Sequence, residues 1–236
     1  MPSDARTAFD KNLKDIERLM ELHKQEGGIS RGRRYGLEVL NKSAIVLITS
    51  YWEAYCEDLA AEAMEHIVKH SKNADALPKA LKKEIAKELQ NDENELAIWE
   101  VADGKWKNYL QSRLVRLQEA RNRKLNTPKS DNIDELFELA VGIPKVSGSW
   151  QWARKMTVER ARTKLDKFVT LRGSIAHRGK SLKGVTRAEV QDYLDFIKQL
   201  AAKTGGKVNS YVRSATGKPL WLTNSSNGCE KSRVAD

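Results

Sequence analysis

An arginine and a histidine lie five positions apart in the segment Arg172-Gly-Ser-Ile-Ala-His177, and the sequence continues with Arg178, Gly179 and Lys180. A guanidinium group holds phosphate oxygens in a fixed fork, and an imidazole group transfers protons near neutral pH. The pair therefore predicts chemistry on a shared phosphate group. The rest of the sequence contains no phosphate-binding loop, metal-ligand cluster or recognisable catalytic triad. We accordingly expect no cofactor and no bound metal.

The spacing of this pair is a weak signal by itself. The same spacing joins Arg18 to His23 within an ordinary charged amphipathic pattern, which we interpret as structural or solvated. His177 differs because basic residues and a glycine follow it, and this pattern indicates a helix end. A helix end is more accessible than a helix interior, and basic surroundings favour the neutral, proton-accepting imidazole. The alternative is a histidine that only interacts with the C-terminus of its helix.

Apolar residues at helical spacing predict helices almost throughout the chain. Three of them are long and cover about residues 3–26, 34–72 and 157–178. The middle of the second, residues 44–55, is nearly all apolar, so we expect that helix to be buried on several sides. The Arg172–His177 pair closes the third helix.

Shorter elements are expected between these long helices. Helices are predicted for residues 79–89, 94–101, 106–122 and 136–141, the last with a capping arrangement at Asn132–Glu135. Residues 142–152 are rich in glycine, proline and serine, which indicates a loop.

A capping box at Thr186 and Glu189 predicts the start of a final helix. The apolar periodicity is lost after Gly205-Gly206. We therefore expect one helical domain over residues 1–203 and a poorly ordered polar tail over residues 204–236.

The net charge of +10 is unevenly distributed. Residues 105–129 carry eight Lys or Arg against one acid, and residues 154–187 carry eleven against two. Such an excess attracts polyanions, and RNA is the common one in the cytoplasm. A basic helix face that only keeps the protein soluble is the alternative. Aromatic residues near these stretches either stack on unpaired bases or pack in the core: Trp106, Tyr109, Trp150 and Trp152.

Three observations bear on location. The longest aliphatic run, residues 44–48, is far shorter than the roughly 20 residues of a membrane span. The start of the chain has no apolar signal core. Cys56 and Cys229 have no spacing typical of a zinc site or a disulfide framework. We expect a cytoplasmic protein that does not associate with membranes.

Three sequence blocks together resemble the HEPN superfamily, and most closely its RiboL-PSP / MAE_28990-like type. The blocks are residues 48–59, 165–177 and 185–197, in that order, and the resemblance covers roughly residues 35–202. It implies an all-α fold, a helical bundle of two long antiparallel helix pairs with short accessory helices.

The resemblance also implies an activity. Many HEPN domains are metal-independent ribonucleases that act as dimers, with two motifs facing each other across a cleft for single-stranded RNA. It assigns catalysis to Arg172 and His177, with Glu53 as an acidic residue that orients the pair. We expect further RNA contacts from Ser174, Arg178 and Lys180.

The predicted reaction is attack of the RNA 2′-hydroxyl on the adjacent phosphate, which yields a 2′,3′-cyclic phosphate. We expect a homodimer in a toxin or antiviral-defence role, with an antitoxin or defence-system protein as a further partner. One departure from the family pattern is Gly173, where a polar residue is usual. It favours the alternatives, a non-catalytic module that binds RNA or a partner protein, or a purely structural dimerisation unit.

Overall fold

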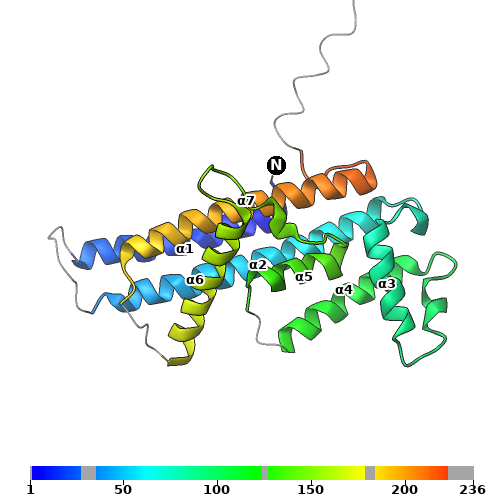
Figure 1. Ribbon diagram of the computed structural model, residues 1–236, viewed down its shortest axis with the longest axis horizontal. Helices are drawn as coiled ribbons and strands as arrows, with labels where there is room; N and C mark the ends of the chain where they lie inside the picture. Colours follow the sequence, from blue (N-terminus) through cyan, green and yellow to red (C-terminus); the bar gives the residue numbers. More distant parts are fainter. Residues whose placement is uncertain (1, 28–35, 124–126, 179–183, 223–236) are drawn as a thin grey trace, which may run out of the picture.

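The computed structural model of the protein describes residues 2–27, 36–123, 127–178 and 184–222. These ranges contain seven α-helices and three short 3-10 helices, and they contain no strand (Figure 1). The α-helices are α1 (Asp4–Gly27), α2 (Glu38–His70), α3 (Lys79–Gln90), α4 (Trp106–Arg123), α5 (Ser130–Val141), α6 (Val158–Arg178) and α7 (Arg187–Thr216). The 3-10 helices are η1 (Ala74–Ala76), η2 (Ala97–Val101) and η3 (Val146–Ser149). The all-α fold class predicted from the sequence is confirmed.

Three helices, α1, α2 and α7, lie along the long axis of the molecule, and α1 runs opposite to the other two (Figure 1). The apolar middle of α2 is buried, as predicted, and α2 packs against α1, α7 and α5. Trp52 of α2 is fully buried, and its ring meets that of Trp150 at a centroid distance of 6.1 Å. Tyr55 packs on Phe9 of α1, with ring centroids 5.0 Å apart. α2 is thus the central helix of the core.

Helix α6 crosses this frame steeply and is fixed by side chains at both sides (Figure 1). Arg162 donates to Asp134 of α5 over 2.6 Å, and Asp166 accepts a hydrogen bond from the backbone of Ser130 over 2.8 Å. On the α7 side, Phe168 and Tyr193 stack with centroids 3.9 Å apart. These contacts orient α6 so that its C-terminal turn lies over the beginning of α2.

Helix α7 extends well beyond its predicted end. It passes through Gly205-Gly206 and continues to Thr216, so the expectation of poor order from residue 204 is wrong for residues 204–222. Tyr55 explains the first glycine, because a Cβ at Gly205 would lie 2.8 Å from its hydroxyl oxygen. Burial of Val208 and Val212 against the core offsets the cost of about 1 kcal/mol that each glycine imposes on a helix. Residues 223–236 lie outside the described ranges.

Two expectations between residues 129 and 152 are also corrected. α5 begins at Ser130, and the capping arrangement predicted at Asn132–Glu135 does not form. Its first turn is bound instead by Asp166 of α6, a partner 36 positions away that a local pattern cannot reveal. The predicted loop over residues 142–152 contains η3, where Ser147 donates to the Asp134 carboxylate from its backbone and its hydroxyl.

Candidate functional site

The Arg172–His177 segment forms the last turns of α6. Arg172, Gly173 and Ser174 are half-buried, and Ile175 is buried against the start of α2. His177 and Arg178 are the last two residues of the helix, but their side chains lie outside the described part, as does all of Lys180. The structure therefore places the arginine side in detail and the histidine by its backbone position only.

Arg172 has an unusual environment for a cationic side chain. Its Nε is shielded from water and has no hydrogen-bond partner. Within the described residues, the guanidinium takes part in no hydrogen bond and no ion pair. It lies close enough to the fully buried Tyr193 for its charge to act on that phenol. Burial raises the pKa of Tyr193, while a hydrogen bond with Thr49 and the Arg172 charge oppose the rise.

Two segments that adjoin α2 and α6 in the sequence contain no acid. Residues 28–35 precede α2 and residues 179–183 follow α6, and together they carry five Lys or Arg and no Asp or Glu. A buried polar N–H without an acceptor costs free energy, and more so on a charged group. The arrangement is therefore suited to an external anion such as a phosphate group.

Positions 172 and 177 do not share one face of α6. Five residues of an α-helix correspond to a rotation of about 140°. Position 177 lies one turn beyond Ser174, whereas Arg172 lies one turn beyond Phe168, on the side that meets Tyr193. A phosphate that contacts both groups must therefore lie across the helix end, or receive one group from a second copy of the chain.

The structure also describes two of the other predicted site residues, Ser174 and Glu53. Ser174 donates its hydroxyl hydrogen bond to the Thr170 carbonyl oxygen over 3.2 Å, within α6. Glu53 is half-buried in the middle of α2 and takes part in an interaction. Gly173 faces open space, since a Cβ there would meet nothing within 4 Å. The roles assigned to Ser174 and Glu53 stay predictions.

An apolar hollow adjoins the motif. It measures about 610 Å³ and lies between Ile175 of α6 and the first turns of α2. Its apolar lining on α2 comes from Val39, Val46 and Leu47, and Val39 is largely exposed. The candidate site therefore combines a cation without a counter-ion and an uncovered apolar surface.

The other histidines and aromatic residues are better explained by packing. His23 is buried beside Asn41, whose amide donates to the Val185 carbonyl oxygen over 2.9 Å, so the structural interpretation holds. The rings of His66 and His70 lie 4.3 Å apart, and no group of three metal-binding side chains occurs in the described ranges.

The aromatic residues considered for base stacking are withdrawn from solvent. Trp106, Tyr109 and Trp150 are buried, and Trp152 packs on Phe196 with ring centroids 5.8 Å apart. The packing alternative therefore holds for them. Trp99, which was not among these candidates, is 66% exposed.

Comparison with family models decides the classification. The model described as RiboL-PSP-HEPN matches residues 10–209. The chain belongs to the RiboL-PSP-HEPN family. The match includes α1 and continues through Gly205-Gly206, which agrees with a helix α7 that is unbroken there. No curated protein and no solved structure matches the chain.

This RiboL-PSP-HEPN domain thus has the helical fold of its superfamily, whose members are often ribonucleases or otherwise related to RNA. None of its described helices is both long enough and apolar enough to cross a membrane.

Proposed function

We propose that this RiboL-PSP-HEPN domain is a metal-independent endoribonuclease that cleaves single-stranded RNA. The observation that carries the proposal is the water-shielded Nε of Arg172, which has no hydrogen-bond partner in the described part of a strongly basic chain. An RNA phosphate supplies the missing acceptor. The family supports the same activity, because its superfamily includes many ribonucleases.

The proposed reaction uses a nucleophile that RNA already carries. The 2′-hydroxyl loses its proton to His177 and attacks the adjacent phosphorus, and the 5′-oxygen leaves with a proton from a second acid. Negative charge grows on the non-bridging phosphate oxygens, where Arg172 stabilises it. The products are a 2′,3′-cyclic phosphate and a 5′-hydroxyl, and His177 of a second copy is suited to act as the acid.

A homodimer is part of the proposal. Positions 172 and 177 lie about 140° apart around α6, so two copies arranged about the helix ends surround a phosphate better than one. The hollow beside Ile175 offers apolar surface for such a contact. Arg178, Lys180 and Ser174 are assigned to flanking phosphates, and Glu53 is the residue that orients the pair. A cytoplasmic toxin or defence enzyme, with an inhibitor protein encoded by the same organism, fits this activity.

Cleavage of a labelled single-stranded RNA in EDTA tests the proposal. The wild type is expected to cleave it, and His177→Ala to lower the single-turnover rate by about 10²- to 10⁴-fold. His70→Ala is the matched control, because His70 lies at the far end of α2, whereas His23 is buried and its loss would disturb folding. An RNA with 2′-O-methyl groups must resist cleavage. Equal activity of the two histidine variants would refute the proposal.

The second candidate is a module that binds RNA without cleaving it, which Gly173 in place of a polar residue favours. It predicts salt-dependent RNA binding by the wild type with no product, and equal binding by His177→Ala. The same RNA and the same two variants therefore separate the two functions.

A further inference from the structure

Three large apolar side chains are exposed on one short segment far from the motif. Leu96 is 67% exposed, Ile98 58% and Trp99 66%. Ile98 and Trp99 lie in η2, and Leu96 is the residue before it. Tryptophan is usually well buried in a monomer. Such a group on one turn marks an interaction surface more often than an accident of packing.

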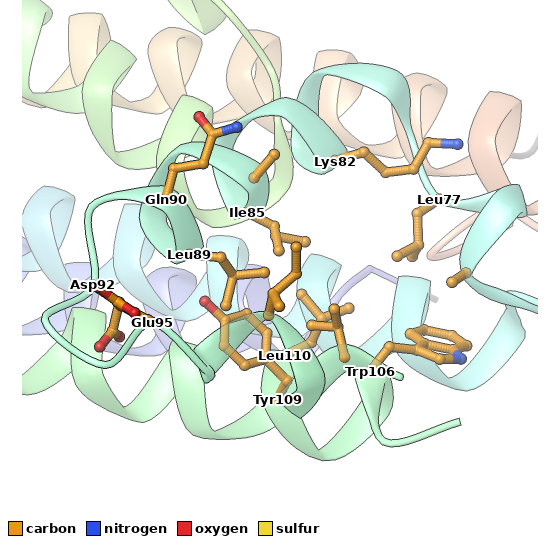
Figure 2. A pocket seen from close by; sticks show the side chains of 14 residues that line it. Leu77, Lys82, Ile85, Leu89, Gln90, Asp92, Glu95, Trp106, Tyr109 and Leu110 are labelled. Carbon is orange, nitrogen blue, oxygen red and sulfur yellow. The ribbon is translucent and has the colours of Figure 1, made fainter. Parts of the chain in front are cut away.

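A cavity of about 600 Å³ opens beside this segment, between α3, η2 and α4 (Figure 2). Ile98 lines it, together with a wall of apolar side chains from the core: Leu77, Ile85, Leu89, Trp106 and Leu110. Figure 2 shows that Asp92 and Glu95 lie at the end of the cavity opposite Trp106. Its size and lining are typical of a site that accepts an apolar group.

A second hollow lies on the other side of η2. It measures about 400 Å³ and is lined by Leu96 and Trp99, with Arg116 among its polar residues. Tyr109 lines both hollows, so η2 forms a ridge between them. A small ligand in the first cavity would leave Leu96 and Trp99 in water. An occupant that covers the whole surface must be larger than such a ligand.

The charge of this segment is opposite to that of the protein. Residues 92–103 contain five acids and no Lys or Arg, in a chain with a net charge of +10. Asp92, Glu95 and Glu100 are exposed, and none of them forms an ion pair within the described residues. These acids disfavour an RNA backbone along η2 itself, and the cations of the two hollows lie on other elements: Lys82, Lys105 and Arg116. The acids instead suit an occupant with positive charge.

We infer that η2 and its two hollows form the docking surface for an amphipathic helix of a partner protein, with lysines or arginines along the edge of its apolar face. One apolar side chain of that helix enters the cavity beside Ile98, and the next turn covers Leu96 and Trp99. Its cations lie over Asp92, Glu95 and Glu100.

The surface is remote from the motif. α2 has 33 residues, which is a length of about 50 Å, and the motif packs at its beginning whereas the cavity lies beyond its end. A bound partner therefore leaves Arg172 accessible. Docking is independent of the proposed nuclease activity, and neither result determines the other.

A designed peptide of leucine and lysine, amphipathic over about 18 residues or five turns, is the probe. Its fluorescence anisotropy is measured with the full chain. We expect the wild type to bind the peptide saturably, with an affinity that falls as the salt concentration rises. The affinity should be at least tenfold lower in Trp99→Ser and in Ile98→Ser. Leu222→Ser removes an equally exposed apolar side chain outside this surface and is expected to leave the peptide affinity unchanged. A peptide with glutamate in place of lysine is expected not to bind.

Several outcomes would overturn the inference. One is equal binding by a scrambled peptide of the same composition, and another is binding that Trp99→Ser leaves intact. Sedimentation that shows a dimer lost in Trp99→Ser would assign the surface to a second copy of this chain instead. RNA binding lost in the same variant would assign it to RNA. Thermal melts establish that each serine variant is folded.

Discussion

Arg113 and Arg172 both have guanidinium N–H groups that are shielded from water, and within the described residues only those of Arg113 have acceptors. Arg113 of α4 is 1% exposed, its Nε and Nη2 donate to the Glu88 carboxylate, and its Nη1 donates to the Leu139 carbonyl oxygen. Arg172 of α6 is half-buried, and its shielded Nε has no hydrogen-bond partner. The first holds α3, α4 and α5 together, whereas the second bonds to nothing in the described structure.

The presence or absence of acceptors separates an arginine that stabilises the fold from one that binds a ligand. Burial of a guanidinium costs several kcal/mol, and bidentate pairing with a carboxylate recovers much of it. Where the partners are missing, the cost remains until a ligand arrives. Arg113 therefore stabilises the folded protein, whereas Arg172 is expected to be fully paired only when an anion is bound.

The largest expected effect comes from Arg172→Ala. We expect cleavage of RNA to slow by about 10²- to 10³-fold, because the developing phosphate charge loses its fixed donor. The free energy of unfolding should stay the same or rise slightly, since an unpaired shielded N–H is removed. Single-turnover rates and urea denaturation measure the two quantities.

Arg213→Ala, an exposed arginine on α7, is the control for loss of charge. Arg172→Lys keeps the charge without the fork and should recover only part of the rate. An Arg172→Ala enzyme with full activity would contradict the assignment.

Arg113→Ala should have the opposite profile. We expect a loss of about 3 kcal/mol in the free energy of unfolding, because the Glu88 carboxylate and the Leu139 carbonyl lose their donors and a cavity forms. The rate of cleavage per folded molecule should not change. Urea denaturation is the measurement, and Lys87→Ala, which removes the ion pair of an exposed lysine with Glu84, should lower the free energy of unfolding far less than Arg113→Ala. If Arg113→Ala left the stability unchanged and abolished cleavage, the roles assigned to the two arginines would be wrong.

The smallest expected effects are changes in stability at two adjacent glycines, one with a close neighbour and one that faces open space. Gly206→Ala should stabilise the protein by about 0.5–1 kcal/mol, because nothing lies within 4 Å of the new Cβ and α7 gains helix propensity. Gly205→Ala should destabilise it by about 1 kcal/mol, since the clash with Tyr55 outweighs that gain. Thermal and urea denaturation of both variants test this, and equal stabilisation by both would show that the Tyr55 hydroxyl moves aside freely.

Local patterns predicted much of the fold. The apolar run of α2 indicated a helix buried on several sides, and five other helices contact α2: α1, α4, α5, α6 and α7. The capping box at Thr186 forms as expected: its hydroxyl accepts from the Glu189 backbone over 3.2 Å, and the Glu189 carboxylate accepts from the Thr186 backbone over 2.8 Å. Interactions within one turn depend on neighbouring residues alone, so the sequence is sufficient to predict them.

The amino-acid sequence by itself determined the all-α class, the main helices and the basic segment that ends in Arg172 and His177. Long-range packing set the rest: α7 continues past Gly205, Asp166 of α6 binds the first residue of α5, Ser130, and Trp99 lies in solvent. It also set which of the two arginines is paired. Each of these depends on residues distant in sequence, because the free energy of burying a group is set by whichever partners the fold brings to it.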